Sequence, residues 1–132
     1  MTASTQIHRV LLVDDEPDIR RIGQLSLERV GGWQVVLAGS SAEALAAAGR
    51  ERPDVILLDV MMPVADGPTT LARLREQADT AEIPVIFMTA KVQQHEVQRL
   101  LGLGAVGVIP KPFDPMTLPD EVRRVLASAE RP

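Results

Sequence analysis

The chain has 132 residues, a net charge of −4, 45% hydrophobic residues and no cysteine. This length suits one compact domain, and the apolar content is sufficient for a core, which excludes a disordered chain. The lack of cysteine excludes disulfides and thiolate metal sites, and the negative charge argues against nucleic acid as the main partner. The longest apolar runs have the length of strands, so we expect no membrane span, and residues 1–6 lack the pattern of a signal peptide.

Short apolar runs alternate with helical stretches along the whole chain. In chain order we expect a strand at 10–13, a helix at 17–30, a strand at 34–38, a helix at 41–50, a strand at 55–58, a helix from 68 onward, a strand at 85–88, a helix at 91–101, a strand at 106–109, and a last helix that starts between 114 and 119 and ends near 128. Apolar runs without alternation are typical of parallel strands that are buried on both faces.

Local signals support several of these helix starts. Ser40 followed by Glu43 is typical of a capping box. Pro68 suits a first helical position, and Asp66-Gly67 before it favours a turn and cap over a metal ligand. The helix at 91–101 has the narrowest apolar stripe, so we expect it to be the most mobile.

The alternation of strands and helices predicts a doubly wound α/β sheet with right-handed crossovers. In such sheets ligands bind at the carboxyl ends of the strands, where the strand order reverses. Asp14, Asp15 and Glu16 follow the first strand, Asp59 ends the third, Thr89 ends the fourth and Lys111 follows the fifth, whereas the second ends in the uncharged Gly39-Ser40. We therefore expect carboxylates, a hydroxyl and an ammonium group at one edge of the sheet.

These groups have a common use in phosphoryl transfer. Carboxylates that lie close together repel one another, and a divalent cation removes the conflict. Oxygen ligands without cysteine or a well-placed histidine favour Mg²⁺ over zinc. A carboxylate can attack phosphorus and form an acyl phosphate, while a metal ion and a lysine offset the charge on the transferring group.

The order and spacing of five motifs resemble the pattern of response-regulator receiver domains of two-component signalling, in particular single-domain, chemotaxis-regulator-like ones. The motifs are Asp14-Asp15, Asp59-Val60-Met61-Met62-Pro63, Asp66-Gly67, Thr89-Ala90 and Lys111-Pro112-Phe113. The resemblance covers nearly the whole chain. It implies a (βα)5 flavodoxin-like three-layer sandwich with a five-stranded parallel sheet of order 2-1-3-4-5. We expect a single domain over 1–132, with a core at about 7–128 and short flexible termini.

The resemblance also implies a role for each acid. Asp59 would be the phosphoacceptor. The carboxylates of Asp15 and Asp59 would bind Mg²⁺ together with the backbone carbonyl of Met61, and Asp14 would help through water or through its charge.

Three further residues would contact the phosphoryl group. Thr89 and Lys111 are expected to reach its oxygens, with Ala90 beside them. The bond between Lys111 and Pro112 is commonly cis in this family, and a cis bond is rare enough to be a sharp check.

The function that the resemblance implies is a switch, not a conventional enzyme. The chain would take a phosphoryl group from a sensor histidine kinase or a histidine phosphotransfer protein and lose it slowly by hydrolysis. It would signal to an unknown downstream protein by binding or by relay. We expect a cytoplasmic protein, a monomer or a phosphorylation-dependent dimer, with neither nucleic acid nor membrane as partner.

One departure from the family pattern leaves the output open. Three residues before the lysine the family usually has tyrosine or phenylalanine, and here the residue is Val108. A degenerate receiver that only binds proteins is therefore one alternative. A Mg²⁺-dependent phosphatase is another, although such enzymes of the haloacid dehalogenase type place an acid where this chain has Met61.

Two groups of charged residues also have an ordinary structural interpretation. The acids at 14–16 could merely cap the first helix. Arg20 and Arg21 could dock an acidic partner, but a solvated helix face is the favoured interpretation.

Overall fold

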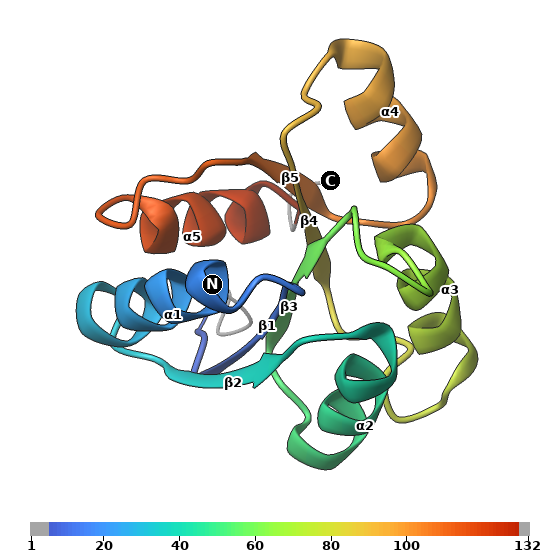
Figure 1. Ribbon diagram of the computed structural model, residues 1–132, viewed down its shortest axis with the longest axis horizontal. Helices are drawn as coiled ribbons and strands as arrows, with labels where there is room; N and C mark the ends of the chain where they lie inside the picture. The colour runs from blue at the N-terminus through green and yellow to red at the C-terminus, as the bar shows by residue number, and fades with distance from the viewer. Residues whose placement is uncertain (1–5, 130–132) are drawn as a thin grey trace.

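The computed structural model describes residues 6–129 (Figure 1). The strands are β1 (Arg9–Val13), β2 (Gln34–Ala38), β3 (Val55–Asp59), β4 (Val85–Thr89) and β5 (Gly107–Pro110). The helices are α1 (Pro17–Leu25), the π-helical turn η2 (Ser26–Val30), α2 (Ser41–Glu51), α3 (Gly67–Glu76), α4 (Gln94–Gly102) and α5 (Leu118–Ala129). The termini that we expected to be flexible lie almost entirely outside the described residues. None of the helices within 6–129 is long and apolar enough to cross a lipid bilayer.

The five strands form one parallel sheet in the order β2-β1-β3-β4-β5. Helices α1 and α5 cover one face and α2, α3 and α4 cover the other, which makes three layers (Figure 1). The predicted flavodoxin-like fold is therefore confirmed. The strand order reverses between β1 and β3, so the carboxyl ends of these two strands frame the point at which ligands bind in such sheets.

The core lies on both sides of the central strands. Every residue of β3 and β4 is buried, which agrees with the apolar runs that predicted them. Phe87 packs toward α2, α3 and α4, and its neighbour Met88 packs toward α1 and α5. Asp59 and Thr89 are the last residues of β3 and β4, so these polar residues lie at the carboxyl edge of the sheet, beyond the apolar part of the core.

Two helices differ from the prediction at their ends. The helix expected at 17–30 is α-helical only to Leu25 and then widens into η2, where the N–H of Gly31 donates to the carbonyl of Ser26, five residues back. Helix α4 begins at Gln94, three residues later than expected. The reason is that the N–H of Lys91 donates to the hydroxyl of Thr89 at 3.0 Å, which forms a turn in place of the first helical turn.

The predicted helix starts at α2 and α3 are confirmed with one change. The Ser40 hydroxyl accepts from the N–H of Glu43 at 3.2 Å, but the Glu43 carboxylate accepts from the N–H of Gly39, at 2.7 Å, and not from that of Ser40. Asp66 caps α3 by accepting from the N–H of Thr69 at 2.9 Å. Asp66 is thus a cap, as its sequence context indicated.

Candidate functional site

Three carboxylates meet at the carboxyl edge of the sheet. Asp14 and Asp15 follow β1 and Asp59 ends β3, and one oxygen atom of each lies within 4.8 Å of the others. Asp14 and Asp59 are buried, and Asp15 is more exposed than either. This set of oxygen donors, with one open side, fits Mg²⁺, which binds few protein ligands and keeps waters.

The carboxylate of Asp14 is directed into the site. Its Oδ1 accepts from the N–H of Glu16 and its Oδ2 accepts from Lys111 Nζ, both at 2.9 Å. Glu16 is the N-cap residue of α1, but its side chain makes no capping hydrogen bond. The alternative in which these acids merely cap the first helix is therefore not supported.

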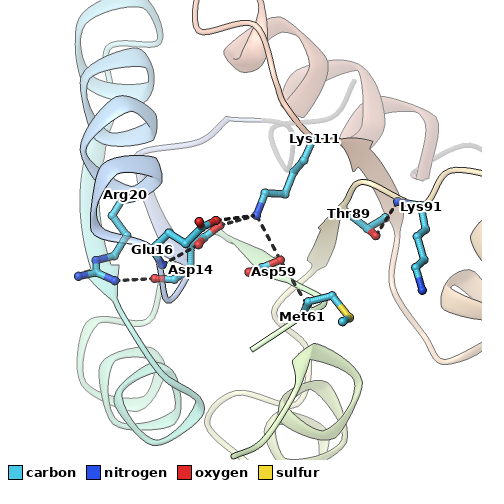
Figure 2. A network of polar contacts seen from close by, with 8 residues as sticks. All are labelled: Asp14, Glu16, Arg20, Asp59, Met61, Thr89, Lys91 and Lys111. Carbon is cyan, nitrogen blue, oxygen red and sulfur yellow. Dashed lines mark hydrogen bonds and ion pairs between the residues drawn. The ribbon is translucent and has the colours of Figure 1, made fainter. Parts of the chain in front are cut away.

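Lys111 joins the two buried acids. Its Nζ lies 2.9 Å from Asp14 Oδ2, 3.4 Å from Asp59 Oδ1 and 4.0 Å from Glu16 Oε1 (Figure 2). Burial by itself would lower the pKa of the ammonium group, but its hydrogen bond to Asp14 and the negative charges of Asp14 and Asp59 outweigh burial and raise that pKa. Lys111 therefore stays protonated and offsets the charge of both acids.

The surroundings of Asp59 raise the pKa of its carboxyl group toward neutral pH. Burial raises the pKa of its carboxyl from 3.8 to about 6, and the charge of Asp14 adds to the rise. The charge of Lys111 and a hydrogen bond of 3.3 Å from the N–H of Met61 counter part of it. Near neutral pH the carboxylate is ionised at a cost, so a cation bound beside it relieves an unfavourable charge.

A pocket of about 290 Å³ opens above Asp59. It is lined by Asp15, Glu16, Asp59, Met61, Thr89, Ala90 and Lys111. Thr89 is buried, and its Oγ accepts from the N–H of Lys91, which leaves the hydroxyl hydrogen free for another acceptor. The structure thus brings together every residue that the sequence suggested for the site. Asp14 does not line the pocket itself but contacts Lys111, which does.

Two expectations from the receiver resemblance concern single residues. The bond between Lys111 and Pro112 is cis, as expected. The backbone carbonyl of Met61 as a metal ligand stays a prediction, since the contact that involves this residue is its N–H with Asp59.

Arg20 lies beside the site, as its place in the sequence suggested, but its contact there was not predicted. Its Nη1 donates to the backbone carbonyl of Asp14 at 2.7 Å, so the expectation of a solvated side chain is wrong. Every residue has a backbone carbonyl, so a side chain that binds one has no partner of a particular residue type. The spacing of residue types in the sequence therefore could not predict the contact of Arg20. Glu16 was seen only as part of the acidic run, and the structure places it in the pocket wall.

Comparison with known proteins gives consistent results. The sequence pattern of the response regulator receiver domain matches residues 10–123. The alkaline phosphatase synthesis transcriptional regulatory protein PhoP of Bacillus subtilis is 38% identical over 122 residues, which are 92% of this chain and 50% of that protein. The chemotaxis protein CheY4 of Vibrio cholerae has a TM-score of 0.83 and 35% identity, over 91% of this chain and 99% of that chain.

A third relative contains a metal ion. The receiver domain of the sensor histidine kinase PA1611 from Pseudomonas aeruginosa, solved with a magnesium ion in its active site cleft, has a TM-score of 0.79 and 29% identity over 92% of this chain and 99% of that chain. The present chain spans about half the length of the curated relatives that it matches. The sequence match covers most of this chain and the fold agrees with it. The chain belongs to the response regulator receiver domain family.

Proposed function

We propose that this receiver accepts a phosphoryl group on Asp59, with Mg²⁺ bound by the acid cluster, and that it signals in its phosphorylated form. The observation that supports this most is the position of Asp59, whose carboxylate is buried at the floor of the pocket beside Lys111, which also binds Asp14. Such a carboxylate is well placed to be a nucleophile because it faces the pocket, where Lys111 can offset the charge that an incoming phosphoryl group brings.

Asp15 and Asp59 would hold the metal ion, with Asp14 behind them. Three acids with oxygens within 4.8 Å repel one another, and the single ammonium group of Lys111 does not neutralise them all. When bound, Mg²⁺ supplies positive charge that draws the acids together and offsets the charge of the phosphoryl oxygens. The magnesium ion in the receiver domain of PA1611 supports this choice of metal.

The transfer step needs three groups of this chain. A carboxylate oxygen of Asp59 attacks phosphorus and forms an O–P bond, while the P–N bond to the imidazole of a phosphohistidine donor breaks and its electron pair stays on the nitrogen. Lys111 Nζ and the free hydroxyl hydrogen of Thr89 then stabilise the phosphoryl oxygens. Hydrolysis of the acyl phosphate returns Asp59 to its starting state.

The donor would be a sensor histidine kinase or a histidine phosphotransfer protein, and the exchange would take place in the cytoplasm. An apolar groove of about 340 Å³ lies between α1–η2 and the loop after β5, and it would offer a docking surface for the donor. The groove is lined by Ile22, Leu25, Ser26, Arg29, Val30, Pro115 and Met116. Its apolar lining would suit the apolar face of a donor helix.

The output would come from the opposite side of the pocket, through binding of a downstream protein, relay or dimerisation. A second groove, of about 400 Å³, lies between α4, β5 and α5, and Val108 lines it together with Val92, Val97 and Val125. Because residue 108 is valine and not tyrosine or phenylalanine, the movement of an aromatic ring cannot transmit the signal. We therefore propose that the downstream protein binds in this groove.

Labelling with a small phosphodonor tests the proposal. Acetyl phosphate with Mg²⁺ should add one phosphoryl group to the wild-type protein, detected by intact-mass spectrometry, and none to Asp59→Asn. Asp66→Asn is the matched control, because asparagine is an equally good helix cap, and it should be labelled like the wild type. Equal labelling of Asp59→Asn and wild type would refute the assignment of Asp59.

A further inference from the structure

Arg20 reaches from α1 to the backbone of the loop that carries the acid cluster. Its Nη1 donates a hydrogen bond of 2.7 Å to the carbonyl oxygen of Asp14. Charge-assisted hydrogen bonds of this kind are short and strong, and they favour one orientation of the carbonyl. Figure 2 shows Arg20 and Lys111 on opposite sides of Asp14, with one cation on its backbone and the other on its carboxylate.

The carbonyl of Asp14 matters because it belongs to the peptide that joins Asp14 to Asp15. A peptide unit is planar, so the carbonyl oxygen and the following N and Cα atoms move together. The carboxylate of Asp14 is already fixed by the N–H of Glu16 and by Lys111 Nζ, both at 2.9 Å. The contact with Arg20 therefore sets the direction in which the chain leaves Asp14, and with it the position of the Asp15 carboxylate.

Gly39, at the end of β2, leaves the space that the guanidinium occupies. A Cβ atom on this residue would lie 2.9 Å from Nη1 of Arg20 and 3.3 Å from its Cζ. Gly39 does not have a positive φ, so alanine could adopt its backbone conformation. A side chain on this residue would push the flexible end of Arg20 aside, so glycine matters here for space and not for conformation. The residue after β2, which carries no side chain, is thus linked to the acid cluster through Arg20.

We propose that Arg20 is a positioning residue for the divalent cation. It orients the Asp14–Asp15 peptide so that Asp15 faces Asp59, and Gly39 leaves the space that its guanidinium occupies. This inference rests on the proposed function, since it assumes that the acid cluster binds Mg²⁺. The direction of the change in Mg²⁺ affinity distinguishes a positioning role of Arg20 from a simple effect of its charge. Removal of a positive charge near the cluster would by itself tighten Mg²⁺ binding, whereas loss of positioning weakens it.

Isothermal titration of the folded, metal-free protein with Mg²⁺ tests the inference. Arg20→Gln and Gly39→Ala should each weaken the affinity, the first on the order of ten-fold, as substitutions of residues that orient metal ligands do. Arg21→Gln is the matched control, because it removes the same charge from an exposed neighbour and should leave the affinity unchanged or slightly tighter. Because Gly39→Ala acts through Arg20, the double variant should bind no more weakly than Arg20→Gln alone.

Unfolding in urea is measured beside the titration, since a purely structural role of Arg20 would lower the free energy of unfolding without a change in Kd. Mg²⁺ binding by Arg20→Gln that is as tight as that of the wild type, or additive effects in the double variant, would overturn the inference alone. If Arg20→Gln does not fold, the Mg²⁺ affinity of Gly39→Ala is the test, and an affinity equal to that of the wild type overturns the inference. A wild-type protein that does not bind Mg²⁺ overturns the proposed function itself.

Discussion

The two sides of the pocket are held by different means. On the side of β1 and β3, Asp14 and Asp59 are buried and share Lys111 at 2.9 and 3.4 Å. On the side of β4 and α4, Thr89 is bonded within its own turn to the N–H of Lys91, and Lys91 is exposed. The first side is fixed because buried charges must be compensated. On the second side, the hydroxyl of Thr89 and the side chain of Lys91 are not bound by an opposite charge in this way, so they can take new partners more easily.

The helices beside β5 repeat this difference. Of the nine residues of α4, all described by the structure, Leu100 alone is buried. Helix α5 buries four residues, which are Leu118, Pro119, Val122 and Leu126. Helix α4, the loosely packed one, follows the loop after Thr89, so we expect this side of the pocket to respond to a bound phosphoryl group more readily than the side of Asp14, Asp59 and Lys111. The acid cluster and this helix thus lie in parts of the molecule that differ in how firmly they are packed.

The chain has two lysines, Lys111 on the side of β1 and β3 and Lys91 on the side of β4 and α4. Their replacement should give the largest difference in the free energy of unfolding. Lys111→Met leaves two buried carboxylates without their cation and should lower the free energy of unfolding of the metal-free protein by about 2 kcal/mol, less than for a fully buried pair because Lys111 is partly exposed. Lys91→Met should change it by less than about 0.5 kcal/mol. Urea unfolding measures both, and equal losses would contradict the comparison.

The pH dependence of stability sharpens the account of Asp59. Between the ordinary pKa of 3.8 and the folded-state pKa of about 6, the folded chain holds a proton that the unfolded chain has lost. This group therefore makes the free energy of unfolding fall as pH rises through that window. Asp59→Asn should be more stable than the metal-free wild type by on the order of 2 kcal/mol at neutral pH, and the advantage should vanish near the unfolded pKa. An advantage that is constant with pH would show that the charge is not its cause.

Thr89 tests the more loosely held side. Thr89→Ala removes one acceptor from the N–H of Lys91 and should cost about 1 kcal/mol of stability or less. The rate of labelling by a phosphodonor should fall much more, on the order of 100-fold, because the hydroxyl acts on the transferring group. Thr89→Ser keeps the hydroxyl and should retain most of the rate. Equal rates for Thr89→Ala and wild type would remove this residue from the site.

The smallest expected effect concerns the helices themselves. Because α4 buries one residue and α5 buries four, backbone amides of α4 should exchange with deuterium faster than those of α5 in the metal-free protein. Hydrogen exchange followed by mass spectrometry resolves the two segments. Slower exchange in α4 than in α5 would contradict both the comparison and the mobility expected from its narrow apolar stripe.

Much of the fold and of the site could be predicted because both depend on simple repeated patterns. Apolar runs marked the buried parallel strands, and the polar residue after each run marked the carboxyl edge, since parallel strands end at the same edge. Asp59 and Lys111 meet for this reason, although they are far apart in sequence. The receiver resemblance gave the strand order, which the alternation of elements alone could not give.

The features that were missed depend on backbone atoms and on space. Arg20 binds a carbonyl oxygen, and Gly39 admits it by having no side chain, so neither has a partner that a pattern of residue types could show. The late start of α4 has a similar cause, because the hydroxyl of Thr89 takes the N–H of Lys91. Such contacts become visible only when the path of the chain is known.

Titration with Mg²⁺ and beryllofluoride, followed by NMR, tests the central claim most directly. The account predicts saturable one-to-one binding that requires Mg²⁺, with the largest amide shifts at Asp15, Asp59, Met61, Thr89 and Lys111, the residues at the acid cluster and the pocket wall. Asp59→Asn should not respond. A response that is the same without Mg²⁺, or the same in Asp59→Asn, would contradict the claim that Asp59 and a bound cation form the phosphoacceptor site.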